Sequence, residues 1–290
     1  MNSYDQDKKE YYWLFQQYTV QIRGKEFTYR YGGNGTKTMV LLPGGLGIAD
    51  AFCNHARKLG QYFKVLSFDY PVHIHTNEEL ADAIALLINH LSIEKVYLVG
   101  QSYGGFLAQI IAARHSEIVE GLILSNTGCL SNEISEEDWK PLYAMINRMK
   151  KVNAILRVVP VGILRKSFIK RSLKHLDGWK DPEYSYMKAL FEDVFGKLTN
   201  KKERQMCQLM IDLANCPKKT KYNFEYLEGK VILFLSKDDF TFGEKIKKAL
   251  IELMPSPVVY DDLDGGHVAL FMKVDTYCER IRDFVMSISK

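Results

Sequence analysis

The fold of this chain is decided by the stretch Val96-Tyr-Leu-Val-Gly100-Gln-Ser102-Tyr-Gly104-Gly. An apolar run typical of a buried strand leads into a G-x-S-x-G turn and then into a segment with apolar residues at helical spacing. In that context the turn lifts the serine hydroxyl out of the backbone. Gly100 and Gly104 lack Cβ atoms, so the strand and the helix can approach closely around the turn. The alternative interpretation is an ordinary glycine-rich loop in which Ser102 only caps the helix.

The bulk composition is that of a globular protein. The 290 residues fit one large domain, or one domain with an inserted subdomain. Apolar residues make up 47% and charged residues 26% of the chain, which is enough to build a full core. The net charge of +4 is too small to indicate a nucleic-acid partner. No stretch approaches the ~18 apolar residues of a bilayer span, so no stable membrane insertion is expected.

Two further features favour a cytoplasmic location. The first ten residues are polar and charged, without the apolar segment of a secretory signal. The five cysteines are scattered and odd in number, with no C-x-x-C pair, as expected for reduced thiols. His73 and His75 form an H-x-H pair after a predicted strand, but no third ligand is in view, so we expect neither a metal site nor a cofactor. The sequence indicates no particular oligomeric state.

Strands and helices alternate along most of the chain, which predicts a mostly parallel sheet with helices on both faces. Eight strands are expected: a hairpin at 18–23 and 26–31, then 39–42, 64–68, the strand beginning at 96, 121–124, 231–235 and 258–260. The expected helices are 51–61, 78–91, the segment after Ser102, 243–253 and a last helix from 268 onward.

The alternation stops between residues 131 and 228, which predicts a helical cap inserted into a core domain of residues 1–130 and 229–290. Three amphipathic helices are expected there, near 139–149, 184–198 and 206–213. The insert contains 19 Lys and Arg residues against 13 Asp and Glu, so it carries the positive balance of the chain. We expect its aromatic residues to form the roof of an apolar pocket. They include Trp139, Tyr143, Phe191 and Phe195.

A serine hydroxyl needs a neighbouring base, and a carboxylate that orients the base, before it can attack at neutral pH. His267 lies in Asp264-Gly-Gly-His267, a glycine-rich loop between the last predicted strand and the last helix. Asp238 and Asp239 follow the strand at 231–235. Because catalytic groups gather beyond the carboxyl ends of parallel strands, the sequence predicts Ser102, Asp239 and His267 as a triad, with Asp238 as the alternative acid.

The tetrahedral intermediate of such a reaction needs hydrogen-bond donors for its oxyanion. The loop Pro43-Gly-Gly45-Leu46-Gly follows the strand at 39–42, and its glycines allow amides to point inward. We expect the backbone N–H groups of Tyr103 and Gly45 to form the oxyanion hole, with Leu46 as the second choice in that loop.

These features together resemble the α/β-hydrolase superfamily over essentially the whole chain from about residue 18. The resemblance implies the α/β-hydrolase fold of the serine hydrolase type. In that family the acid usually stands three residues after a strand-ending glycine, and Ser236 occupies that place here, which again points to Asp239. Pro43 stands where the family commonly has a histidine. The stretch from Asp69 to Asn126 is locally similar to maspardin-like members.

The sequence therefore predicts a serine hydrolase that cleaves a small to medium carboxylic ester, lactone or amide through an acyl-enzyme, with an apolar, ester-like small molecule as its partner. The resemblance to maspardin-like members implies an alternative, a non-catalytic ligand- or protein-binding member of the same fold. A third hypothesis is contact with a membrane surface through residues 157–175, where apolar and basic side chains are mixed.

Overall fold

The computed structural model describes residues 3–176 and 178–288, and a single eight-stranded sheet organises them in the order β1-β2-β4-β3-β5-β6-β7-β8. The strands are β1 Gln16–Ile22, β2 Lys25–Gly33, β3 Thr38–Leu42, β4 Lys64–Ser67, β5 Val96–Gln101, β6 Val119–Ser125, β7 Val231–Phe234 and β8 Val258–Tyr260. Only β2 runs antiparallel to its neighbours, and all other pairs are parallel. The predicted mostly parallel, eight-stranded sheet is confirmed.

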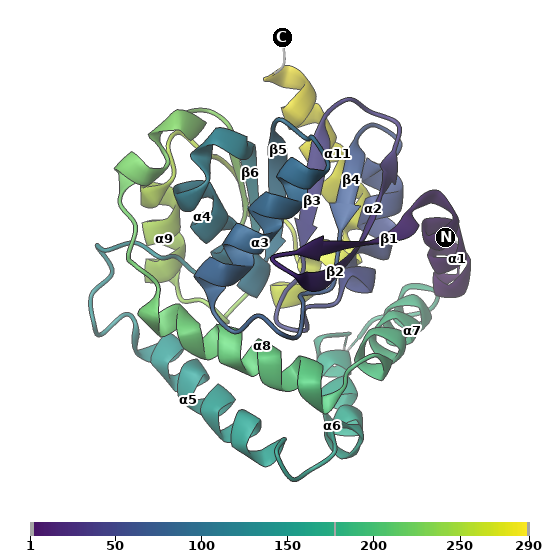
Figure 1. Ribbon diagram of the computed structural model, residues 1–290. Coiled ribbons are helices and arrows are strands. Elements are labelled where there is room, and N and C mark those ends of the chain that lie inside the picture. Colours follow the sequence, from purple (N-terminus) through teal and green to yellow (C-terminus); the bar gives the residue numbers. More distant parts are fainter. Residues whose placement is uncertain (1–2, 177, 289–290) are drawn as a thin grey trace.

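Helices cover both faces of the sheet, as predicted (Figure 1). One face packs against α3 Asn77–His90, α4 Tyr103–Arg114 and α9 Glu244–Leu253. The other packs against α1 Tyr4–Leu14, α2 Cys53–Leu59, α10 Ala269–Met272 and α11 Val274–Ser287. The boundaries of α2, α3 and α9 agree with the expected helices to within a few residues, because apolar periodicity marks the buried stripe directly.

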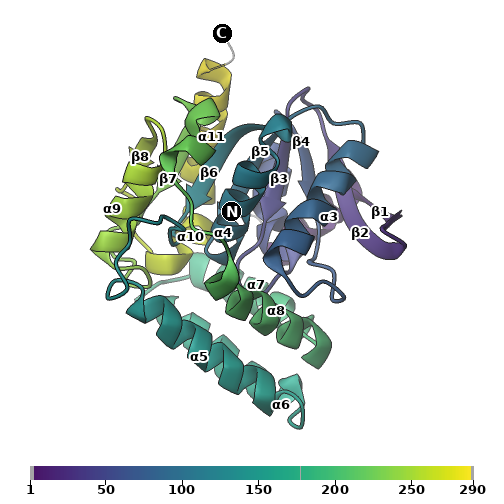
Figure 2. The ribbon, with the colours of Figure 1, turned by 60° about the vertical axis from the view of Figure 1, so that its left-hand side comes forward.

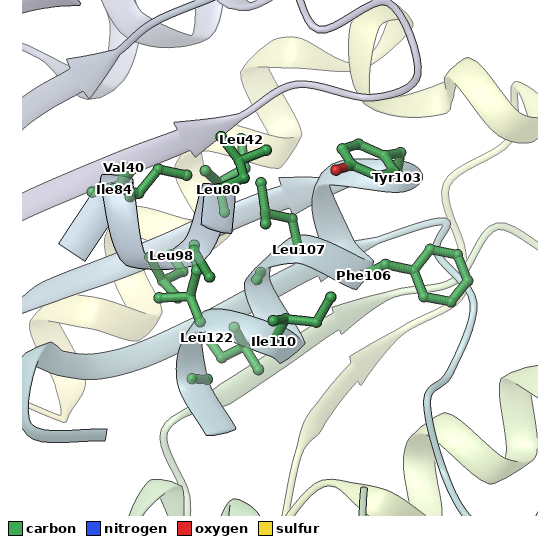
Figure 3. Close-up of a cluster of buried hydrophobic side chains, with 14 of the residues drawn as sticks. Val40, Leu42, Leu80, Ile84, Leu98, Tyr103, Phe106, Leu107, Ile110 and Leu122 are labelled. Carbon is green, nitrogen blue, oxygen red and sulfur yellow. The ribbon is translucent and has the colours of Figure 1, made fainter. Parts of the chain in front are cut away.

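The two-residue period of the strands divides the core into two layers. In β3, Val40 and Leu42 face one hydrophobic cluster, whereas Met39 and Leu41 face the other. Figure 3 shows the first cluster, in which Val40 and Leu42 lie near side chains of α3 and α4. Every residue of β3 and β5 is buried, and this is why both strands are apolar almost without interruption.

The segment between β6 and β7 forms four long helices, which are α5 Lys140–Ile155, α6 Val161–Leu173, α7 Glu183–Gly196 and α8 Asn200–Asp212. They pack as two pairs, α5 with α8 and α6 with α7. Figures 1 and 2 show the pairs side by side at one end of the sheet. The first pair extends the hydrophobic cluster of α3 and α4, and the second extends the opposite cluster. The limits of the cap at 131 and 228 stay a prediction.

Helix α1 has no counterpart among the predicted elements, since its sequence is polar and lacks an apolar stripe. Ser3 caps it by accepting a hydrogen bond from the N–H of Gln6. Its polar tertiary contacts include two with α7: Tyr4 Oη donates to Asp193 at 2.7 Å, and Tyr186 Oη donates to Asp7 at 3.0 Å. The helix is thus stabilised by polar contacts between distant segments together with the buried rings of Tyr4 and Tyr11, which are too few to produce a clear periodicity.

Candidate active site

The G-x-S-x-G turn has the strained geometry that the sequence predicts. Ser102 has φ +53° and ψ −118°, a conformation that non-glycine residues rarely adopt. A Cβ at Gly104 would lie 2.0 Å from the carbonyl oxygen of Leu42, and one at Gly100 would lie 2.3 Å from that of Gly104. Both positions therefore require glycine, and the turn holds α4 directly against β3 and β5.

Three of the predicted site residues meet at the carboxyl end of the sheet. The hydroxyl Oγ of Ser102 is 2.8 Å from Nε2 of His267, and Nδ1 of the same imidazole is 2.9 Å from Oδ2 of Asp239. The His267 side chain is 22% exposed and that of Asp239 only 2%. The imidazole can therefore exchange a proton with the hydroxyl while its other nitrogen donates to the carboxylate.

The surroundings of Asp239 favour its ionised form. Burial by itself would raise the pKa of this carboxyl, but the hydrogen bond and charge of His267 outweigh it, and the net pKa lies below the ordinary value of 3.8. The N–H of Thr241 adds a hydrogen bond of 2.8 Å to Oδ1. Asp239 is thus poised as an anion that fixes the orientation of the imidazole.

The neighbouring Asp238 has a different task. Its Oδ2 accepts hydrogen bonds from the N–H groups of Gly265 and Gly266, both at 2.9 Å. These glycines have φ values of +121° and +57° and come directly before His267. Asp238 therefore holds the loop that carries the histidine, and Asp239 is the carboxylate that reaches the ring.

Asn126 is a site residue that the sequence-based prediction missed. Its side chain accepts from the N–H of Ser236 at 2.9 Å and donates to the carbonyl of Gly266 at 2.8 Å. It thereby ties the loop after β7 to the loop that carries His267. The sequence signal that could have identified Asn126 is a polar residue directly after a buried strand. Beside it, Thr127 Oγ1 donates to the carbonyl of Ser102 at 2.6 Å.

The glycine-rich loop after β3 forms a tight turn beside the serine. The N–H of Gly47 donates to the carbonyl of Gly44 at 2.9 Å, which places Gly45 and Leu46 at the centre of the turn. Tyr70 Oη anchors the loop by donating to the carbonyl of Pro43 at 2.7 Å. Gly45, Leu46 and Ser102 line the same cavity. The role of the Gly45 and Tyr103 N–H groups as hydrogen-bond donors to the oxyanion stays a prediction.

The cavity at Ser102 has a volume of about 190 Å³, and α7 covers it. The side chains that α7 contributes to its lining are Leu190, Phe191, Val194 and Phe195. Ser172 of α6 and Phe271 also line it, so apart from a few polar groups the walls are largely apolar. Phe191 and Phe195 thus form part of the roof, as expected.

Trp139 does not belong to this roof, contrary to the sequence-based expectation. It lines a separate and larger cavity of about 520 Å³ between α5 and the loop after β7. Tyr143 packs beside it, with the two rings 6.3 Å apart. The expectation was wrong for both residues because the cap splits into two helix pairs, and α5 stands over the opposite side of the site. Phe242 lines the larger cavity, 5.9 Å from the ring of His267.

Three other expectations concern cysteines, metal ligands and membrane spans. All five cysteines are free and buried. Within residues 3–176 and 178–288, no group of three or more His, Cys, Asp or Glu side chains is placed to hold a metal ion. None of the helices described has both the length and the apolar character needed to cross a bilayer.

Comparison with known proteins finds similarity over part of the sequence. The pattern of the family described as "alpha/beta hydrolase fold" matches residues 37–149. Human maspardin (Homo sapiens) is 38% identical over 92 residues, which are 31% of this chain and 30% of maspardin. Proline iminopeptidase PfmaB of Pestalotiopsis fici is 34% identical over 124 residues, 37% of this chain and 43% of that protein. The chain thus spans about a third of the maspardin length.

Solved structures match over nearly the whole chain. A thermophilic esterase from Thermogutta terrifontis has a TM-score of 0.70 and 18% identity, covering 95% of this chain and 100% of its own. The enol-lactonase from Burkholderia xenovorans has a TM-score of 0.69 and 20% identity, covering 93% and 100%. At these identities the likeness concerns the arrangement of the backbone.

Proposed function

We propose that the chain is a serine hydrolase of the α/β-hydrolase superfamily and that it cleaves a small to medium carboxylic ester, lactone or amide. The observation that carries the proposal is the continuous hydrogen-bonded chain from Ser102 through His267 to Asp239, with distances of 2.8 and 2.9 Å. The neighbouring Asp238 is committed to backbone N–H groups, which favours Asp239 as the acid.

In the proposed mechanism, Ser102 Oγ attacks the substrate carbonyl while Nε2 of His267 takes the hydroxyl proton. Asp239 stabilises the imidazolium that forms. The N–H groups of Gly45 and Tyr103 donate to the oxyanion of the tetrahedral intermediate. His267 then returns the proton to the leaving alcohol or amine, and a water activated by the same imidazole hydrolyses the acyl-enzyme. These steps require neither a metal nor an organic cofactor.

The cavity supports the proposed substrate class. A space of about 190 Å³ with apolar walls suits a small acyl group that carries little charge. The esterase and the enol-lactonase with the same fold act, by their names, on esters and lactones, and the iminopeptidase on a proline peptide. The five free, buried cysteines suit a reducing compartment, and we propose a cytoplasmic location on that ground.

A fluorophosphonate probe tests the proposal, since it phosphonylates only serines that a neighbouring base activates. Ser102 is expected to react, and Ser102→Ala should lose both labelling and turnover of p-nitrophenyl acetate. Ser172→Ala is the matched control for labelling, because Ser172 lines the same cavity and its loss should leave labelling at Ser102 intact.

The alternative function is ligand or protein binding without catalysis. It is favoured by the similarity to maspardin and by Pro43, which stands where the superfamily commonly has a histidine. If correctly folded protein fails to react with the probe and turns over no ester, lactone or amide, the hydrolase proposal is wrong and the binding function is preferred.

A further inference from the structure

The cap contains a long segment without a single acidic residue. Between Trp139 and Leu176 the sequence has ten Lys or Arg residues and no Asp or Glu. The rest of the chain holds 29 basic and 35 acidic residues, a net charge of −6. This segment builds α5 and α6, which form the outer layer of the cap (Figures 1 and 2). The charge of the molecule is therefore strongly polarised towards one end.

Most of these cations have no acidic partner within the part of the chain that the structure describes. Seven of them are exposed and form no ion pair with any residue that the structure describes. They are Arg148, Lys150, Lys151, Arg157, Lys166, Lys170 and Lys174. The ion pairs of the cap involve other cations, among them Lys140, Lys188 and Lys197. The positive charge of this layer is thus available to an external anion.

Residues 155–163, which we call the cap tip, comprise the end of α5, the turn after it and the start of α6, and they also expose aliphatic side chains. Val158 is 84% exposed, Ile163 68% and Ile155 46%. An isolated exposed aliphatic residue is ordinary, but three of them within nine residues form a local apolar surface. Pro160 ends the turn and lets α6 begin at Val161.

Cations flank the apolar residues on both helices. Ile163, Lys166 and Lys170 follow one another at spacings of three and four residues, so they share the exposed face of α6. On α5, Lys151 lies one turn before Ile155 and is also exposed. An apolar centre with a basic margin is typical of segments that lie on an anionic membrane surface.

We propose that the cap tip docks on the anionic surface of a lipid bilayer, with Ile155, Val158 and Ile163 reaching the boundary between head groups and acyl chains. The flanking Lys and Arg side chains contact the anionic head groups. Nucleic acid could also attract the charge, but its phosphate backbone offers nothing to the exposed aliphatic side chains. Since no described helix could span a bilayer, the association is peripheral.

Docking in this way would bring the candidate active site close to the lipid surface. Helix α6 begins at the cap tip, and Ser172 near its other end lines the cavity of Ser102. Ser172 stands eleven residues after Val161 along the helix, a rise of about 16 Å. The docking itself does not depend on the chemistry at Ser102, so the two proposals can fail separately.

Sedimentation with vesicles tests the inference. The full chain should sediment with vesicles of phosphatidylcholine and phosphatidylserine, remain in solution with phosphatidylcholine alone, and be released as salt is raised. A triple variant with Lys151, Lys166 and Lys170 changed to Glu should bind at least about 100-fold more weakly, since each lost basic residue at an anionic surface costs about a factor of five and the new carboxylates are repelled. Val158→Asp should also weaken binding to the vesicles, although it leaves the net positive charge of the basic segment almost unchanged.

The matched control reverses Lys9, Lys25 and Lys248, three exposed lysines outside the cap, and it should bind vesicles as the unmodified chain does. Ser102→Ala should also bind normally, which separates docking from catalysis. Equal losses in the two triple variants would overturn the inference, because net charge alone would then explain binding. Retention on heparin or RNA without binding to anionic vesicles would overturn it as well and would favour a polyanion as the partner.

Discussion

The sheet domain and the cap each shield a carboxylate oxygen from solvent, and the two carboxyl groups differ in pKa. Asp239 is 2% exposed, but both its oxygens accept hydrogen bonds, and its pKa lies below 3.8. Glu203 of α8 is half-buried, with its Oε2 shielded from solvent and without a partner among the residues described, and this desolvation raises its pKa to about 7. Burial therefore does not set the charge of a group by itself; the partners supplied by the surrounding loops do.

Two glycines also differ between the sheet domain and the cap, in how closely other atoms surround them. Gly104 in the sheet domain is enclosed by backbone, whereas Gly196 at the end of α7 has nothing within 4 Å of a built Cβ. The site in the sheet domain is held by close backbone packing, while the cap is packed more loosely at its edges. We expect substitutions in the two regions to differ in both size and sign.

The largest expected effect is a loss of catalysis caused by a substitution in the sheet domain. Asp239→Asn should lower kcat for p-nitrophenyl acetate by about 10⁴, because the amide no longer holds the imidazole in the productive tautomer. Asp238→Asn is the matched control. It weakens only the support of the His267 loop and should cost about ten- to hundredfold. Equal losses, or a larger one at Asp238, would contradict the assignment of Asp239 as the acid.

The second prediction concerns stability and compares the two glycines. Gly104→Ala should destabilise the fold by about 3 kcal/mol or more, since the new methyl group would overlap the carbonyl of Leu42. Gly196→Ala should instead stabilise it by up to about 1 kcal/mol, because alanine lowers the entropy of the unfolded chain and fits the helix. Urea denaturation measures both, and a stable Gly104→Ala variant would show that the turn can relax away from β3.

The third prediction concerns the half-buried carboxylate of Glu203 in the cap. The folded-state pKa of Glu203 lies above its ordinary value of 4.5, so the folded protein binds this proton more tightly than the unfolded chain does. The free energy of unfolding should then fall as the pH rises from 4.5 to about 7. Glu203→Gln should remove this fall and be more stable than the unmodified chain by about 1–2 kcal/mol near pH 8.

Asp239 provides the opposite case for the same experiment. Its folded-state pKa is lowered, so the stability that it contributes is present above pH 3.8 and is lost as the pH falls further. Denaturation curves across the acid and neutral range should therefore separate Glu203→Gln from Asp239→Asn. If Glu203→Gln proves less stable near pH 8, an unrecognised partner stabilises the carboxylate.

The smallest expected effect concerns the boundary between the two cavities. Phe242 lines the larger cavity and lies against both His267 and Phe106. Phe242→Ala should open a passage from the cavity of Ser102 and raise the kcat/KM ratio of p-nitrophenyl octanoate to acetate by about tenfold. Phe240→Ala is the control, since that ring is 89% exposed, and it should leave the ratio unchanged. An unchanged ratio in Phe242→Ala would mean that the two cavities remain separate.

Much of the fold could be predicted because the strongest signals are local. The apolar run of β5 and the G-x-S-x-G turn lie within ten residues, and the two-residue and 3.6-residue periods mark strands and helices directly. Helix α1 escaped prediction because its stability comes from contacts such as that of Tyr4 with Asp193, 189 residues away. The prediction of the residues that form the roof of the site was half wrong for the same reason. Trp139 and Phe191 both fit amphipathic helices, and the sequence does not specify where those helices are placed.

The sequence by itself determined which residue types stand after which strands, because backbone sterics and apolar periodicity act over a few neighbours. From this came the strained serine, the late histidine and a pair of adjacent aspartates. Only the tertiary structure decided which aspartate faces the imidazole, which helix covers the serine and which face of the cap stays charged and exposed. Those outcomes depend on side chains far apart in the chain, whose distances are set when the sheet and the two helix pairs pack together.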